Sequence, residues 1–230
     1  MGGLSPSYSL QSFILGNVCE DLERSPRLPR MAMLDFTSSL YLGIQHHSQS
    51  LKPWRRLTTG KPAALFSPKD HIELGRKIAA LQGLEDGVIS QSTLHLCWDL
   101  FGILGKNNFL ALMDSGAYPI AQWGLVRFAF NGNEVIKFKH HQVDNLSRAL
   151  RARLQPGQRP LVVTDGWCPH CGELAPLQDY LDCVRPYNGM LIVDDTQALG
   201  VFGTNPRQSQ PYGLGGGGSL RYLHMGGRRI

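Results

Sequence analysis

The sequence lacks any apolar run of the ~18 residues that a membrane-spanning helix requires. It also lacks a basic segment followed by an apolar core near its start, so it predicts no secretory signal. Charged residues make up only 18%, and the net charge of +5 is scattered, which argues against a nucleic-acid surface. There are only five cysteines, an odd number that favours a reducing compartment over a disulfide framework. These absences predict a cytoplasmic globular protein with no membrane partner and no nucleic-acid partner.

Segments with helical and strand periodicity alternate through the middle of the chain. Helices are expected at 70–81, 94–104, 118–127, 144–154 and from Ala175 onward, with Asp70 and Asp144 as N-caps. Strands are expected at 87–90, 108–114, 133–138, 161–164 and 190–193. This alternation, in 230 residues with 42% hydrophobic content, predicts an α/β fold: a three-layer, doubly wound, mostly parallel sheet. The glycine run before Ser219 is expected to be a flexible or ligand-approaching loop.

Acidic residues follow two of the predicted strands. Asp165 ends the strand that begins near Leu161, and Asp194 ends the strand that begins at Met190. Open α/β sheets bind ligands outside the carboxyl ends of their strands, so Asp194 is the first candidate for a site residue. The polar turn at Ser92 and Thr93 precedes a helix and has a geometry suited to anion binding, but the local pattern alone favours an ordinary capped helix.

The segment Trp167-Cys168-Pro169-His170-Cys171 has a second interpretation. A Cys-x-x-Cys between a strand and a helix is typical of thioredoxin-like thiol-disulfide oxidoreductases, in which the helix N-terminus activates the first cysteine. A metal site would need a second pair of ligands, which the local sequence does not show. The adjacent histidines in His46-His47 and His140-His141 would point apart on a strand or helix, so without distant partners they are poor metal ligands and are expected to be surface or loop residues. Cysteines occurring by chance in a loop are the simplest reading.

Four motifs in order resemble the α-oxoamine synthase branch of the fold-type-I pyridoxal-phosphate (PLP) enzymes, which includes 8-amino-7-oxononanoate synthase. They are Asp35–Gly43 (DFTSSLYLG), Asp70–Leu74 (DHIEL), Asp165-Gly166 with Gly172–Leu177 (DG…GELAPL), and Val193–Gly203 (VDDTQALGVFG). The last two, correctly spaced, carry most of the resemblance. It implies the large domain of such an enzyme at 46–230, preceded by an N-terminal arm at 1–45.

The resemblance implies a role for each matching residue. Asp194 would pair with the pyridine nitrogen of PLP, and Gln197 stands where the family has a histidine near the phenolic oxygen. Tyr118 would stack on the ring, Ser92 and Thr93 would bind the phosphate, and Asp165 would lie near the substrate amine. Asp194 and Asp165 are therefore the expected catalytic residues, and no metal is expected.

The resemblance also implies an activity and its partners: condensation of an amino acid with an acyl thioester such as acyl-CoA, or a related aminotransferase reaction, in a homodimer. The sequence departs from the family in lacking the lysine that binds PLP covalently beyond the Val193–Asp195 segment, since its last lysine is Lys139. Pro169 also replaces an expected serine. The large domain is thus expected to be incomplete, without the C-terminal small domain, and inactive as this chain. A non-catalytic scaffold is the alternative.

Overall fold

The computed structural model of the chain describes residues 69–222. The predicted N-terminal arm, the boundary near residue 46 and the Asp35–Gly43 motif lie outside these residues. Within them, no helix is both long enough and apolar enough to cross a membrane.

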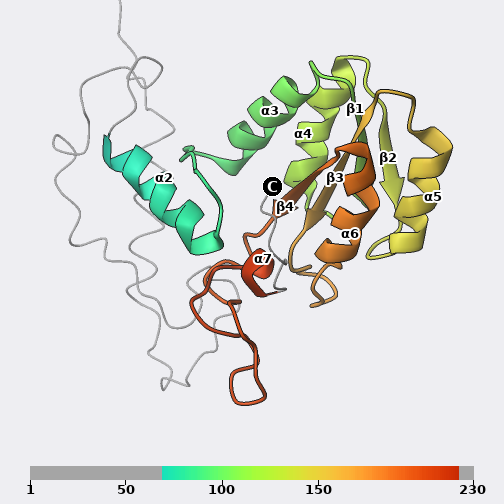
Figure 1. Cartoon of the computed structure of the whole chain (residues 1–230). Helices are drawn as coiled ribbons and strands as arrows, with labels where there is room; N and C mark the ends of the chain where they lie inside the picture. The colour runs from blue at the N-terminus through green and yellow to red at the C-terminus, as the bar shows by residue number, and fades with distance from the viewer. Residues whose placement is uncertain (1–68, 223–230) are drawn as a thin grey trace, which may run out of the picture. The chain divides into compact units, whose positions relative to one another are not determined.

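The centre of the described fold is a sheet of four parallel strands: β1 (Phe109–Asp114), β2 (Val135–Phe138), β3 (Arg159–Asp165) and β4 (Met190–Asp194) (Figure 1). The strands lie in the order β2-β1-β3-β4. The chain therefore moves from β1 to one side and then returns to continue on the other. Between β1 and β3 the winding reverses, which is where doubly wound sheets bind ligands. The predicted mostly parallel sheet is confirmed.

Helices cover both faces of this sheet (Figure 1). On one side lie α3 (Thr93–Leu104) and α4 (Pro119–Phe130), and on the other lie α5 (Val143–Arg153) and α6 (Leu177–Val184). The remaining helices are α2 (Lys69–Gln82), a single 3-10 turn η4 (Arg185–Tyr187) and the short α7 (Ser219–Tyr222). Each helix predicted between 70 and 184 is present with boundaries close to those expected.

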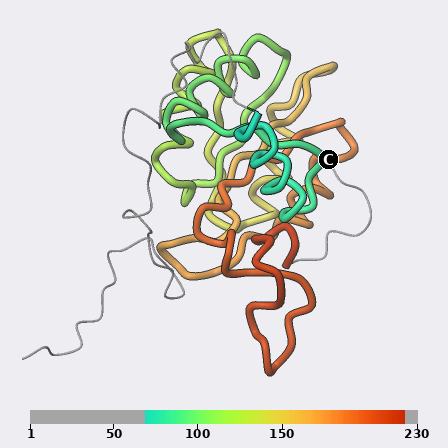
Figure 2. Tube along the Cα trace, turned by 90° about the vertical axis from the view of Figure 1, so that its left-hand side faces the viewer, coloured from blue at the N-terminus to red at the C-terminus, as the bar shows by residue number. Residues whose placement is uncertain are grey.

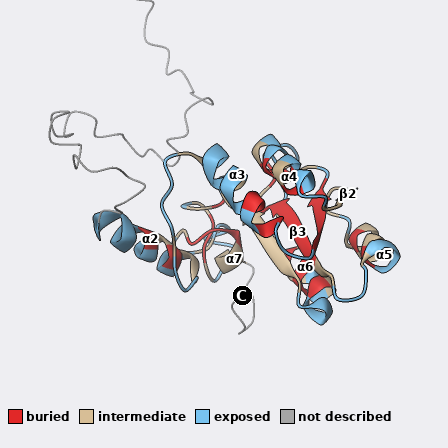
Figure 3. Ribbon diagram, turned by 90° about the horizontal axis from the view of Figure 1, so that it is seen from above, coloured by how far each residue is buried: buried red, intermediate tan, exposed pale blue. Residues whose placement is uncertain are grey.

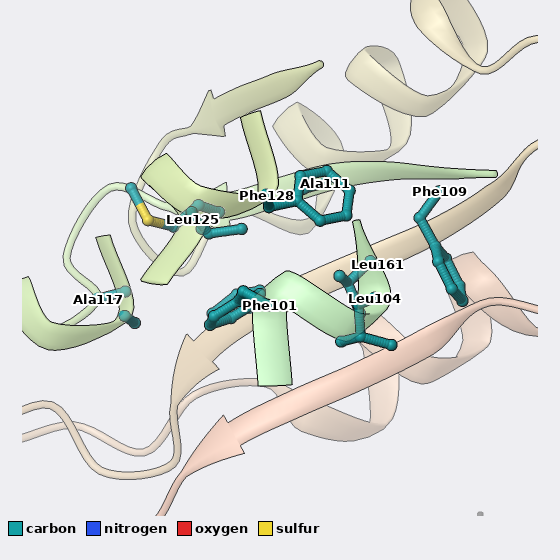
Figure 4. Packing of buried hydrophobic residues seen from close by; sticks show 11 residues of the cluster. Phe101, Leu104, Phe109, Ala111, Ala117, Leu125, Phe128 and Leu161 are labelled. Carbon is teal, nitrogen blue, oxygen red and sulfur yellow. The ribbon is translucent and has the colours of Figure 1, made fainter. Parts of the chain in front are cut away.

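Successive side chains of each strand point to opposite faces of the sheet, so the protein has two separate hydrophobic cores, one on each face. In β1, Phe109, Ala111 and Met113 face α3 and α4, whereas Leu110 and Leu112 face α5 and α6. Because both faces are covered, all six residues of β1 are buried. Figure 4 shows the first core, where Phe101 and Phe128 from the two helices pack over the strands. Figure 3 shows that burial is concentrated in the central strands.

Three local expectations are wrong. Asp70 is not an N-cap, because it lies in the first turn of α2. Residues 87–90 form no strand, because Gly87 packs directly against Gly75 of α2 and Val88 is exposed, so no strand lies beside them. Helix α5 begins one residue before the expected cap, so Gln142 is its N-cap and Asp144 lies in its first turn. Asp144 there still interacts favourably with the helix dipole.

The segment after β4 consists of turns, isolated bridges and α7 (Figure 2). The glycine run is held in place: Gly200 N–H donates to the Gly216 carbonyl at 2.8 Å, and Gly218 N–H donates to the Phe202 carbonyl at 2.8 Å. Gly216 and Gly218 have positive φ, which explains why glycine occupies these turns. Asp195 accepts hydrogen bonds from Ser219, which attaches this segment to the end of β4. The backbone of the glycine run is therefore hydrogen-bonded to the segment Gly200–Phe202.

Candidate functional site

Asp165 and Asp194 are direct neighbours at the carboxyl ends of β3 and β4, where the two residues are paired in the strand register. The carboxylate of Asp194 accepts hydrogen bonds from the Thr196 backbone N–H at 3.1 Å and from the Thr196 hydroxyl at 2.6 Å. Asp165 accepts one from the Tyr118 backbone N–H at 3.1 Å. This last bond joins the N-cap of α4, which follows β1, to the end of β3 across the point where the winding reverses. Both acids are thus oriented before any ligand arrives.

A cavity lies over these acids, with an empty volume of about 500 Å³ that includes its open mouth. It is lined by Thr93, Tyr118, Ile120, Asp165, Trp167, Pro169, Asp194, Thr196 and Gln197. Five of the six residues predicted from the sequence therefore meet in one place, although they are up to 104 positions apart in the chain, from Thr93 to Gln197. Ser92, the sixth, is the N-cap of α3 and does not line the cavity.

Four lining residues were not predicted: Ile120, Trp167, Pro169 and Thr196. Trp167 and Pro169 belong to the loop after β3, and Thr196 follows the acids that end β4. Because all three residues follow the carboxyl end of a strand, their position in the sequence could have predicted that they line the site. Ile120 in the first turn of α4 carries no such signal, because an apolar residue there is usually core.

The N-terminus of α3 contributes Thr93 to the cavity. Ser92 has an extended backbone and its side chain makes no capping hydrogen bond. The first-turn amides of α3 thus receive no side-chain cap from Ser92. The anion-binding interpretation of this turn is therefore better supported than that of an ordinary serine cap.

The two acids are electrostatically different. Burial, reinforced by the nearby Asp194 and Asp114, raises the pKa of Asp165 to about 6, although the Tyr118 N–H opposes the shift. Burial also raises the pKa of Asp195, against the hydrogen bonds from Ser219. A carboxyl with a pKa near 6 can gain or lose a proton close to neutral pH.

Replacing Asp165 by Asn should stabilise the protein at pH 7.5 and leave its stability unchanged at pH 4. The folded pKa of Asp165 is raised above its usual 3.8, so its contribution is fully present below that value and is lost as the pH rises through about 6. The free energy of unfolding should rise by about 1–2 kcal/mol at the higher pH, measured by denaturant titration. The exposed Asp179→Asn on α6 is the control. An equal effect at both pH values would contradict the assignment.

A second group of side chains gathers next to the cavity. Asp114, at the end of β1, is fully buried and accepts four hydrogen bonds. The donors are the Gly116 N–H (2.8 Å), His140 Nδ1 (2.6 Å), the His141 N–H (3.1 Å) and the Tyr180 hydroxyl (3.1 Å). On the far side of the His140 ring, Nε2 lies 3.4 Å from the sulfur of Cys171. His140 and His141 lie in the turn after β2, as expected for loop residues, but both are partly buried and form hydrogen bonds with Asp114.

Charges in this group are coupled. Burial alone would raise the pKa of Asp114, but hydrogen bonds from Gly116, His140 and His141 lower it below its usual value. Burial would lower the pKa of His140, but Asp114 raises it above the usual value. Burial raises the pKa of Cys168, yet the backbone amides of Cys171 and His170 bring it below its ordinary value. His140 and Cys168 are thus biased toward their charged forms.

The thioredoxin-like interpretation is wrong. Helix α6 begins at Leu177, so Cys168 lies in a loop and not at a helix N-terminus. Its loop is closed by the Cys168 N–H donating to the Glu173 carbonyl at 3.0 Å. The helix that would activate a redox thiol is therefore absent from its position.

Comparison with known proteins gives consistent relatives, although no family model matches the chain. It is 30% identical over 184 residues to a putative 8-amino-7-oxononanoate synthase of Phenylobacterium zucineum, covering 74% of this chain and 45% of that protein. It is 25% identical over 211 residues to the putative 8-amino-7-oxononanoate synthase of Trichodesmium erythraeum (89% and 50%). An 8-amino-7-oxononanoate synthase of Mycobacterium bovis is 28% identical over 198 residues (83% and 50%).

Solved structures give the same fold. Serine palmitoyltransferase from S. paucimobilis superposes with a TM-score of 0.60 at 23% identity, over 74% of this chain and 39% of that chain. The Sphingomonas wittichii serine palmitoyltransferase gives 0.56 at 22%, over 64% and 36%. The chain spans about half the length of the curated relatives it matches. In sequence, the chain is similar to 8-amino-7-oxononanoate synthases of the α-oxoamine synthase branch of the fold-type-I pyridoxal-phosphate enzymes, and the solved structures agree with it in fold.

Proposed function

We propose that the cavity over Asp165 and Asp194 binds PLP, and that the whole protein condenses an amino acid with an acyl thioester. The observation that carries the proposal is the convergence of Thr93, Tyr118, Asp165, Asp194 and Gln197 on one cavity at the reversal of the sheet. When bound, PLP supplies an electron sink for a carbanion at the substrate Cα.

The lining residues suit the chemical groups of this cofactor. The carboxylate of Asp194, fixed by Thr196, would hold a proton on the ring nitrogen. The exposed ring of Tyr118 offers an aromatic face, and the amide of Gln197 can donate a hydrogen bond to an oxygen. The α3 N-terminus at Thr93 offers amides to a phosphate. Asp165 would accept a proton or a hydrogen bond from a substrate amine.

Among the residues of 69–222, no lysine lines the cavity. Binding by these residues is therefore proposed to be non-covalent. The substrates, an amino acid and an acyl-CoA-type thioester, the homodimer and a cytoplasmic location are part of this proposal and rest on the family resemblance.

The test uses 4-deoxypyridoxine 5′-phosphate, which has the ring nitrogen and phosphate of PLP but no aldehyde to react with surface lysines. Equilibrium dialysis should give saturable binding of about one molecule per chain, and PLP itself should compete and be removed by dialysis. Inorganic phosphate should compete weakly, as a ligand for the α3 N-terminus alone. Absence of saturable binding, or binding that PLP does not displace, would overturn the proposal.

A further inference from the structure

We propose that Cys168, Cys171 and His140 bind a zinc ion, beside the cavity but separate from it. The proposal does not depend on PLP binding. It joins the two cysteines of the loop after β3 to a histidine that lies 28 positions before Cys168, in the turn after β2.

The spacing of the three ligand atoms supports a common ion. The two sulfurs and a ring nitrogen of His140 all lie within 4.8 Å of one another. The distance from His140 Nε2 to the Cys171 sulfur is 3.4 Å. Two ligands of a tetrahedral zinc ion, at ordinary Zn–S and Zn–N bond lengths, are about 3.5–3.8 Å apart. A small contraction of the loop would therefore complete the geometry.

The histidine is already oriented as a metal ligand. Its Nδ1 is engaged with the buried carboxylate of Asp114 at 2.6 Å, so Nε2 is the nitrogen that faces the cysteines. A carboxylate behind a ligating histidine fixes the ring and its tautomer, as in many zinc sites. Asp114 is itself fixed by Gly116, His141 and Tyr180, so this orientation is determined by the fold.

The position for a fourth ligand has further donors beside it. His141 and Glu173 form a second group with Cys171, again with ligand atoms within 4.8 Å of one another. Within 69–222, His141 Nε2 is a buried side-chain nitrogen without a hydrogen-bond partner. A buried polar atom in that state is costly, and metal binding or a bound water would satisfy it.

The donor set selects the metal. Two thiolates and an imidazole favour zinc, whereas Mg²⁺ and Ca²⁺ prefer oxygen ligands. On binding, any proton on the cysteine sulfurs and the Nε2 proton of the imidazolium form of His140 are released to the buffer, and no electron transfer is needed. Because Trp167 and Pro169 of the same loop line the cavity, the ion would fix one wall of it.

The test is a cobalt and zinc titration of reduced, chelator-treated protein under anaerobic conditions. One equivalent of Co²⁺ should give the visible bands of a tetrahedral site and a thiolate charge-transfer band, and Zn²⁺ should then remove both. Zinc should also protect two thiols from a thiol reagent. His140→Gln and the double variant Cys168→Ser/Cys171→Ser should each lose the one-equivalent binding.

Two matched variants control for mere loss of a cysteine or histidine. Cys183→Ser, in α6, and His170→Asn, inside the same loop, should bind metal as the parent does. Retained binding of 4-deoxypyridoxine 5′-phosphate, or an unchanged unfolding midpoint, shows that a variant is folded. A cobalt spectrum without the thiolate band, parent-like binding by folded His140→Gln, or a Cys168–Cys171 disulfide that persists in place of metal would overturn the proposal.

Discussion

Asp194→Ala should weaken the binding of 4-deoxypyridoxine 5′-phosphate by about 100-fold. A hydrogen bond between charged groups contributes about 1.5–3 kcal/mol, and each tenfold in affinity is about 1.4 kcal/mol. The backbone N–H and the hydroxyl of Thr196 both donate hydrogen bonds to the Asp194 carboxylate. The carboxylate is therefore already oriented, and binding does not pay the entropy of fixing it. Asp194→Asn should lose nearly as much, because an amide cannot stabilise a protonated ring nitrogen. Equilibrium dialysis at constant pH measures the effect.

The matched control is Asp182→Ala, an exposed acid on α6 that pairs with Arg185. It should bind the analogue as the parent does. A second readout comes from Asp165, whose pKa is raised in part by Asp194. In Asp194→Ala that pKa should fall toward its usual value, which NMR titration of the side chain can follow. Unchanged binding by a folded Asp194→Ala would remove Asp194 from the site.

Asp114→Ala should lower the free energy of unfolding by about 3–5 kcal/mol, measured by denaturant titration with EDTA present. Asp114 is fully buried, and its removal leaves four donors without their acceptor, including the imidazole of His140. Breaking a buried pair by removing one partner is costly because the other partner stays desolvated. The exposed Asp99→Ala, which breaks only the surface pair with Arg127, should change stability by less than about 1 kcal/mol.

The pH dependence of this loss has a defined sign. The folded pKa of Asp114 is lowered, so its contribution is present above its usual value of 3.8 and is lost as the pH falls. The folded pKa of His140 is raised, so its contribution is full below its usual value of 6.5 and is lost as the pH rises above that. The difference between parent and Asp114→Ala should therefore be largest between about pH 4 and 6.5. A difference that grows steadily toward pH 9 would contradict the pairing.

Local pattern was sufficient for most of the fold. Strands β1, β3 and β4 have continuous apolar runs and end in aspartate, and α5 has leucines at helical spacing. These signals depend only on residues that are close in sequence, so they predict the elements without knowledge of the tertiary structure. The strand predicted at 87–90 is absent, because strand formation there depends on tertiary neighbours and not on the local sequence. Its apolar pair suits a strand, but only the position of neighbouring strands decides whether a ladder forms.

The cavity was predictable because strand ends in a parallel sheet share one edge. Asp165 and Asp194 needed no knowledge of side-chain contacts to be placed together. The group around Cys168 was not predictable in this way, since His140 lies 28 residues before it and its orientation depends on the buried Asp114. Pairing of distant loops is a property of packing, and a local sequence window contains no signal for it.

Strand β4 has a consequence for how the protein behaves at high concentration. Within 69–222 it is an outer strand of the sheet, with a partner only on its β3 side. Its first four residues, Met190 to Val193, are apolar and partly exposed, and none of them carries the charge that usually discourages pairing at an edge. Open backbone groups beside apolar side chains form a template for another strand. Any handling that leaves this edge uncovered favours intermolecular strand pairing and precipitation.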